Sequence, residues 1–223
     1  MYLSRLILNP RSRQVRSELA RPYEMHRTLL RAFPHGKVHT GRTEDDASGL
    51  LFRVEEDART GRLQLLAQSQ QPPDWTYLAP SDYLLPTLAD NPGIREVMLQ
   101  LQPGQLLAFR LRANPTKRLS AGKGNKGKRV GIYDEEAQLA WLARKGTQHG
   151  FRLLQAQVSR DGKFKQDKAV QAENGVHDLE LLSVQFDGIL QVSDPAALVS
   201  SVAAGIGSGK AFGFGLLSLA RPS

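Results

Sequence analysis

The stretch RPYEMHRTLLRAF, residues 21–33, predicts the helix around which the first part of the chain is organised. Proline suits the first turn of a helix, so Pro22 marks its start. Met25, Leu29 and Phe33 recur at helical spacing and form one apolar stripe. The stretch therefore predicts a helix that packs one face against a core.

Tyr23 and His26 lie three residues apart on this helix, so their side chains project from neighbouring places on its surface. His26 also stands at the border of the apolar face. Two interpretations follow: a half-buried structural histidine beside a packed tyrosine, or a phenol and an imidazole that move protons near neutral pH. The two residues alone favour the structural interpretation, because lone histidines are common and catalytic ones are few.

The composition favours a polyanionic partner. The 223 residues hold 30 Lys and Arg against 22 Asp and Glu, a formal charge of +8, which suits nucleic acid first and an anionic membrane surface second. The chain has no cysteine, which excludes disulfides, thiolate nucleophiles and zinc sites built on cysteine. No apolar run approaches the roughly 20 residues of a membrane span, and the first ten residues do not resemble a secretory signal. We expect a cytoplasmic protein.

The first hundred residues begin with a regular alternation of elements. They predict a strand over 3–8, a helix over 11–20, the helix from Pro22, and a hairpin over 50–67 that turns at Thr60-Gly61. Residues 35–48 lack periodicity and predict a mobile loop. His35 and His39 have the spacing of metal ligands on a helix, but Pro34 and Gly36 argue against a helix there. Residues 71–103 are rich in proline, and within them 94–101 suit a short helix or strand.

The second half of the chain predicts the order β-α-β-β-α-β. The expected elements are a strand over 107–113, a mobile basic loop over 117–129, a helix over 134–149, a strand over 151–158 that runs into a basic turn at 160–165, a hairpin over 179–192 about Asp187-Gly188, a helix over 194–204, a glycine-rich loop over 205–215, and a strand over 216–219. This order is the ferredoxin-like arrangement, and the first part of the chain begins the same way. The sequence therefore predicts an α+β protein of two tandem ferredoxin-like (RRM-like) domains, 1–101 and 102–223.

The glycine-rich loop GIGSGKAFGFG, residues 205–215, is not a Walker loop. Such a loop needs glycine where Ala204 stands and Ser or Thr where Ala211 stands, and it follows a strand rather than a helix. Five glycines in eleven residues exceed what a plain connection needs. Their backbone N–H groups could approach a phosphate chain closely.

Four motifs, in this order along the chain, resemble those of a known family. They are Leu-Asn-Pro at 8–10, PYEMHRTL at 22–29, RLRANPTK at 110–117, and GIGSGKAFGFGLL at 205–217. The chain is similar to the CRISPR-associated repeat-processing endoribonucleases of the CasE branch, which are subunits of the type I-E Cascade complex. The resemblance spans nearly the whole length.

This resemblance implies two ferredoxin-like domains and metal-independent cleavage of CRISPR repeat RNA at the base of its hairpin, with the product retained. It also implies partners, namely the repeat RNA hairpin and other Cascade subunits, with the chain a monomer when free and no cofactor or metal. His26 matches the family's catalytic histidine and Tyr23 its accompanying tyrosine. Arg31 stands where the family has lysine; arginine keeps the charge but is a poorer proton donor.

The chemistry of RNA fits these residues independently. RNA carries its own nucleophile, the 2′-hydroxyl, so the site needs a base for that hydroxyl, an acid for the leaving 5′-oxygen, and in-line placement of the phosphate. We assign proton transfer to His26 with Tyr23 as its partner, and leave open which group takes the proton first. Acidic runs at 44–46 and 55–57 suggest two-metal catalysis as a competing interpretation, but their loop and strand-end contexts favour solvated surface.

Basic residues and glycines along the chain are the candidates for RNA binding. They are Arg27, Arg31, Lys117, Arg118, Lys123, Lys126, Lys128, Arg129, Arg160, Lys163, Lys165, Gly207, Gly209 and Lys210. The alternative function is a non-catalytic RNA-hairpin-binding protein that uses the same surface.

Overall fold

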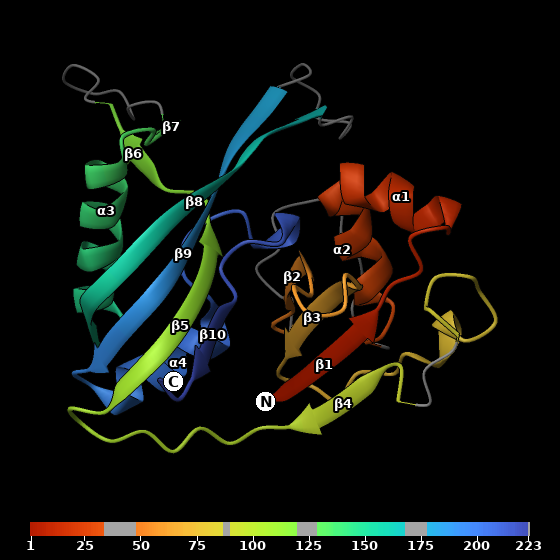
Figure 1. Ribbon diagram of the computed structural model, residues 1–223, viewed down its shortest axis with the longest axis horizontal. Coiled ribbons are helices and arrows are strands. Elements are labelled where there is room, and N and C mark those ends of the chain that lie inside the picture. Colours follow the sequence, from red (N-terminus) through yellow and green to blue (C-terminus); the bar gives the residue numbers. More distant parts are fainter. Residues whose placement is uncertain (34–47, 87–89, 120–128, 168–177, 223) are drawn as a thin grey trace. The chain divides into compact units, whose positions relative to one another are not determined.

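The computed structural model describes residues 1–33, 48–86, 90–119, 129–167 and 178–222, with the backbone alone over 160–167 and 178–180. The chain forms two compact units (Figure 1). The first consists of Met1–Gln100, Ala203–Gly205 and Lys210–Leu216, and the second of Leu101–Val202, Ile206–Gly209 and Leu217–Ser223. The glycine-rich loop is thus divided between the two units. Independent folding of 1–101 and 102–223 as domains stays a prediction.

The first unit is a four-stranded antiparallel sheet with two helices. Its elements are β1 (Tyr2–Ile7), α1 (Arg13–Ala20), α2 (Pro22–Leu30), β2 (Leu51–Glu56), β3 (Leu63–Ser69), the short 3₁₀ helix η1 (Thr76–Leu78) and β4 (Gly93–Glu96). The strand order β2-β3-β1-β4 is that of a ferredoxin-like fold. In the described residues between β3 and β4, η1 takes the place of the second long helix of that fold.

The second unit repeats the arrangement in full. Its elements are β5 (Leu106–Ala113), α3 (Glu135–Gln148), β8 (Phe151–Asp167), β9 (Asp178–Val192), α4 (Pro195–Ala204) and β10 (Leu217–Ala220). The antiparallel order is β10-β5-β9-β8. A separate two-stranded ribbon pairs β6 (Thr116–Arg118) with β7 (Arg129–Gly131), and a second 3₁₀ helix, η2 (Lys210–Phe212), precedes β10. The predicted α+β fold of two tandem ferredoxin-like units is confirmed.

Side-chain caps explain where three helices begin. The hydroxyl of Ser12 accepts a hydrogen bond from the Val15 N–H at the start of α1. The carboxylates of Asp134 and Asp194 accept from backbone N–H groups three residues on, at 2.8 and 3.0 Å, and so start α3 and α4. The predicted starts of α3 and α4 are confirmed, whereas α1 begins at Arg13, two residues after its predicted start at 11. None of the described helices is both long and apolar enough to cross a membrane.

The predicted hairpin about Asp187-Gly188 is wrong, because β9 runs through both residues without a turn. Gly188 pairs with Phe109 on one side and Ala156 on the other. A side chain at Gly188 would place its Cβ only 2.0 Å from the carbonyl oxygen of Gln155. The glycine is therefore needed for close strand approach rather than for a turn.

The predicted basic turn at 160–165 is also wrong. Arg160, Lys163 and Lys165 belong to β8, and they pair in register with Val184, Leu182 and Glu180 of β9. A register shift between Arg160 and Gly162 absorbs the extra residue of the Asp161-Gly162 pair as a β-bulge. The turn signal in the sequence thus marks an irregularity inside a long strand.

The predicted basic loop over 117–129 is wrong at both ends. Lys117 and Arg118 pair with Val130 and Arg129 in the β6–β7 ribbon. Lys123, Lys126 and Lys128 lie outside the described residues, as do His35, His39 and most of the loop expected over 35–48.

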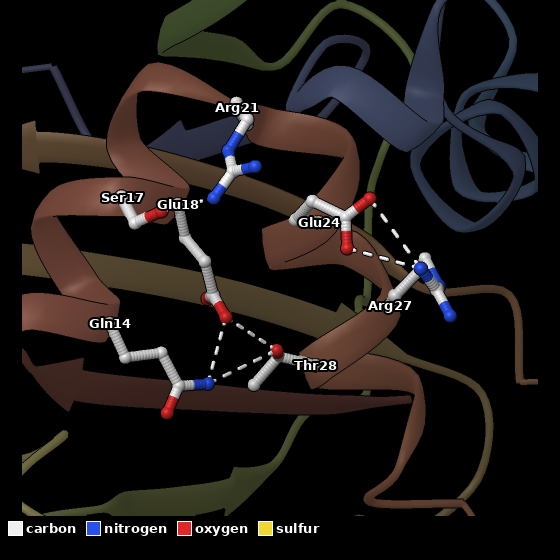
Figure 2. Close-up of polar contacts among 7 residues, drawn as sticks. All are labelled: Gln14, Ser17, Glu18, Arg21, Glu24, Arg27 and Thr28. Atoms are coloured by element: carbon white, nitrogen blue, oxygen red, sulfur yellow. Dashed lines mark hydrogen bonds and ion pairs between the residues drawn. The ribbon is translucent and has the colours of Figure 1, made fainter. Parts of the chain in front are cut away.

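A buried polar network fixes α1 against α2 in the first unit (Figure 2). The Glu18 carboxylate, 5% exposed, accepts hydrogen bonds from the Thr28 hydroxyl at 2.7 Å and the Gln14 amide at 2.8 Å. It also accepts from the buried Tyr83 hydroxyl at 2.7 Å. A buried carboxylate with three donors is stable only while all of them stay in place, so this network sets the position of α2.

Two tyrosines make stability sensitive to alkaline pH. Burial raises the pKa of Tyr83, and Glu18 raises it further; burial also raises the pKa of Tyr77. An unfolded tyrosine titrates near 10.0, so above that pH the unfolded state loses protons that the folded state keeps. We expect these groups to leave the unfolding free energy unchanged below that pH and to lower it above, by about 1.4 kcal/mol per pH unit for each tyrosine.

Urea unfolding at several pH values, from about 8 to about 11, measures this slope. Tyr83→Phe is expected to remove the part of the alkaline decrease in unfolding free energy that Tyr83 contributes. It also lowers stability at every pH, because Glu18 loses one hydrogen-bond donor. A variant with the wild-type slope above pH 10 would contradict the assignment.

Candidate active site

The helix α2 presents Tyr23 and His26 side by side. Pro22 occupies the first turn of α2, and Met25 and Leu29 anchor the opposite stripe in the core. His26 is buried, with 9% of its surface exposed, while Tyr23 is half-buried. The two ring centroids lie 6.3 Å apart. The predicted helix and its apolar stripe are confirmed, and the two candidate groups are neighbours.

Two phenylalanines enclose this pair. The ring of Phe52 on β2 stacks on His26, with centroids 6.1 Å apart and planes 16° apart. The ring of Phe212 on η2 lies against Tyr23, at 5.7 Å and 32°. The four rings Phe52, His26, Tyr23 and Phe212 form what we call the ring cluster. It joins β2, α2 and η2, and all its members belong to the first unit.

A buried arginine holds the end of the glycine-rich loop next to β2. Arg53, 2% exposed, donates from Nη1 to the carbonyl oxygen of Leu216 at 3.1 Å. Its Nε also pairs with the Glu55 carboxylate at 3.2 Å. The Arg53 side chain is buried because loop residues cover its face of β2. At the same place, a Cβ on Gly213 would lie 3.3 Å from the Phe52 ring, so the loop backbone packs closely there.

The glycine-rich loop uses its glycines for backbone geometry. Gly207 and Gly209 have φ angles of +89° and +83°, which residues with a side chain rarely adopt. Lys210, at the start of η2, is exposed. The loop thus presents a cation beside the ring cluster, two residues before Phe212.

Arg27 and Arg31, the other candidates on and after α2, are both held by neighbours. Arg27 is exposed and pairs with Glu24 at 3.1 Å, a contact drawn in Figure 2. The Arg31 guanidinium lies over the Tyr77 ring, 4.6 Å from its centroid. The Tyr77 hydroxyl donates to the Thr28 carbonyl at 2.7 Å near the end of α2. Tyr77 therefore fixes both the helix end and the arginine that follows it.

The remaining candidates lie in the second unit. Lys117, Arg118 and Arg129 are exposed on the β6–β7 ribbon. Gly207 and Gly209 also belong to this unit. Arg160, Lys163 and Lys165 are residues of the strand β8. The candidates thus form two groups, one around α2 and η2 and one on the second unit.

The acidic run at 55–57 has structural partners. Glu55 pairs with Arg53, and Asp57 caps the turn between β2 and β3 by accepting from the Thr60 hydroxyl and from the N–H groups of Thr60 and Arg59. The Thr60 hydroxyl bond is the main reason that the pKa of Asp57 is lowered. In the described part of the chain, no three His, Asp or Glu side chains are grouped so that they could hold a metal ion. The run at 44–46 lies outside the described residues.

Comparison with known proteins identifies the family. Residues 1–221 match the family model described as CRISPR associated protein. The CRISPR-associated endoribonuclease Cse3 of Thermus thermophilus is 37% identical over 227 residues, covering 99% of this chain and 100% of the relative. The Cascade subunit CasE of Escherichia coli is 34% identical over 229 residues, covering 99% of each.

The three-dimensional structure of the chain is also similar to that of this family. A solved structure of Cse3 bound to a 19-nucleotide RNA superimposes with a TM-score of 0.81 at 36% identity, covering 99% of this chain and 100% of that one. The chain therefore belongs to the CRISPR-associated proteins of the CasE branch.

Proposed function

We propose that this chain is an endoribonuclease that binds the hairpin of a CRISPR repeat transcript and cuts at its base. In this proposal the 2′-hydroxyl next to the scissile phosphate is the nucleophile, and no metal ion takes part. The products carry a 5′-hydroxyl and a 2′,3′-cyclic phosphate. The chain then keeps the guide RNA as a subunit of a Cascade complex.

The observation that carries the proposal is the enclosed pair of Tyr23 and His26. An imidazole exchanges protons near neutral pH, and the stacked Phe52 ring limits the orientations that His26 can take. Transesterification needs a base for the 2′-hydroxyl and an acid for the 5′-oxygen. His26 is the main proton-transfer group, and Tyr23 orients it or acts as its partner.

The relatives and the charge of the chain support the same activity. The relative from T. thermophilus is named as a CRISPR-associated endoribonuclease, and a solved structure shows T. thermophilus Cse3 bound to RNA. The relative from E. coli is named as a Cascade subunit. This chain spans their full length. The net charge of +8 favours a polyanionic substrate. Lys210 and Arg31 add positive charge near α2, where it would stabilise the pentavalent phosphate.

Incubation of end-labelled repeat hairpin with excess protein separates this proposal from the alternative. An endoribonuclease converts the hairpin to two fragments at one position, whereas a non-catalytic RNA-binding protein shifts its mobility in a native gel and leaves it intact. A hairpin with a scrambled stem is the control. Binding of the intact repeat hairpin without fragments would favour the alternative.

Phe212→Ala is expected to slow cleavage about tenfold, because small losses of alignment at a reacting centre have large kinetic effects. The variant removes the ring that packs against Tyr23 while leaving both proton-transfer groups in place. Phe212→Leu, which keeps an apolar side chain of similar length, is the matched control and should retain most of the rate. Single-turnover cleavage with saturating protein measures both, and equal rates for wild type and Phe212→Ala would contradict the role.

The ribbon arginines and lysine are expected to bind phosphates. Replacing Lys117, Arg118 and Arg129 with glutamine should flatten the plot of log affinity against log salt by about two to three units, because each phosphate contact that is lost no longer releases its condensed counterions. The matched control replaces Arg11, Arg13 and Arg16, which are exposed in the first unit, and changes the net charge equally. An equal change of slope in both triple variants would mean that net charge, not the ribbon, sets the salt dependence.

A further inference from the structure

On the sheet face opposite to α2, the first unit carries a pocket near β1 that the proposed cleavage does not use. Successive residues of a strand point to opposite faces. Leu6 and Leu8 enter the core beneath α1 and α2, whereas Arg5, on the central strand β1, is exposed on the other face. There Arg5, Gln64 of β3 and the turn between β2 and β3 line a pocket of about 240 Å³.

The floor of the pocket is fixed by hydrogen bonds. Arg5 pairs across the sheet with Gly93, which has no side chain and so leaves space beside the guanidinium. Asn91 lies two residues before β4, and its side chain hydrogen-bonds to the β1 backbone as a strand would. It accepts from the Ile7 N–H at 2.8 Å and donates to the Ile7 carbonyl at 2.9 Å.

The rim is equally fixed. The carboxylate of Asp57 accepts from the N–H groups of Arg59 and Thr60 at 3.1 and 2.8 Å, and the Asp57 N–H donates to the Arg62 carbonyl at 2.9 Å. Arg59 and Arg62 are thus presented from a turn that six hydrogen bonds around Asp57 hold in place.

The guanidinium N–H groups of the three pocket arginines can bind a further anion. Arg5, Arg59 and Arg62 are exposed, and among the described residues none of the three guanidinium groups makes an ion pair. A guanidinium recognises a carboxylate or a phosphate through two parallel N–H bonds. Three such groups around one concavity therefore suit an anionic group from another molecule.

The charges around the pocket favour a single carboxylate over a run of phosphates. Asp57 and Asp90 line the same pocket, and they would repel the regularly repeating phosphates of an RNA strand. A protein partner can place one carboxylate among the guanidinium groups and a cation beside Asp90.

We propose that this arginine pocket, defined by Arg5, Arg59 and Arg62, docks an acidic segment of a neighbouring protein subunit. The inference rests on the proposed role as a Cascade subunit. A carboxylate of the partner binds the arginines, and electrostatic complementarity of this kind sets the partner and its orientation.

The test is co-assembly with the remaining Cascade subunits and guide RNA. Arg5, Arg59 and Arg62 are replaced together by glutamate, and in a milder variant by glutamine. The matched control is the glutamate triple at Arg11, Arg13 and Arg16. We expect the pocket variants to leave the assembled complex about tenfold faster than the control, in a competition with labelled wild-type subunit. Their hairpin cleavage should stay at the wild-type rate, which also shows that they fold.

The outcomes are distinct. Equal release of the pocket and control variants would overturn the docking site and leave the proposed ribonuclease untouched. A loss of hairpin affinity confined to the pocket variants would overturn it in favour of an RNA site. Failure of the wild-type chain to cleave repeat RNA or to enter the complex would instead contradict the proposed function.

Discussion

Replacement of His26 with alanine is expected to slow cleavage of a repeat hairpin by about a hundredfold or more, because general acid–base help is lost. Hairpin affinity should change little, since binding is spread over many basic residues. The variant loses one ring of the ring cluster, so its thermal unfolding is measured beside its single-turnover rate. Added imidazole is expected to restore part of the rate by entering the space that the side chain leaves.

Two controls separate chemistry from packing. Tyr23→Phe keeps a ring against Phe212 and should slow the reaction less than His26→Ala. Phe52→Leu loosens the packing of His26 but keeps the imidazole, and should also slow it less. A folded His26→Ala protein that cuts at the wild-type rate would remove His26 from the mechanism.

A single 2′-deoxy substitution at the nucleotide upstream of the cut is expected to stop cleavage. The proposed reaction takes its nucleophile from that position, so no other group in the site can substitute for it. The substituted hairpin should bind with nearly unchanged affinity, because one hydroxyl contributes little to contacts dominated by phosphates. Single-turnover assays with labelled RNA measure the rate, and native gels measure the affinity.

The position of the substitution gives the control. A 2′-deoxy nucleotide one step downstream of the cut removes a hydroxyl that the mechanism does not use, and this RNA should be cut normally. Cleavage of the upstream-substituted RNA at the wild-type rate would require a nucleophile from outside the RNA.

Local patterns in the sequence were sufficient for most of the fold. The apolar spacing of Met25 and Leu29 predicted α2, and Asp134 and Asp194 marked the starts of α3 and α4, because caps and helical periodicity depend on nearby residues. The second unit therefore follows the predicted order of strands and helices, whereas in the first unit η1 stands where that order has a second helix.

Two predicted turns were wrong, because the backbone at both places is set by long-range strand pairing, which local sequence patterns do not show. Asp187-Gly188 has the composition of a tight turn, yet Gly188 is required by the approach of the Gln155 backbone in β8. Asp161-Gly162 likewise marks a bulge between paired strands. In both cases the Asp-Gly pair indicates an irregular or tightly packed backbone. Whether the chain forms a turn there or stays in a strand depends on the strand pairing.

The candidate site was predictable only in part. Tyr23 and His26 share one helix, so their proximity follows from spacing. Phe52, Arg53 and Phe212 come from elements far apart in the chain, and their meeting depends on how η2 packs against β2 and α2. The alternation of phenylalanine and glycine in the loop was the one local signal for Phe212.

The central claim is that the RNA supplies its own nucleophile while the side chains of this chain move the protons. Its most direct test is to cleave the repeat hairpin in excess chelator and determine both product ends by mass spectrometry. The account predicts full activity, a 5′-hydroxyl on one fragment and a 2′,3′-cyclic phosphate on the other. A 5′-phosphate with a 3′-hydroxyl, or activity lost in chelator and restored by a divalent cation, would contradict it.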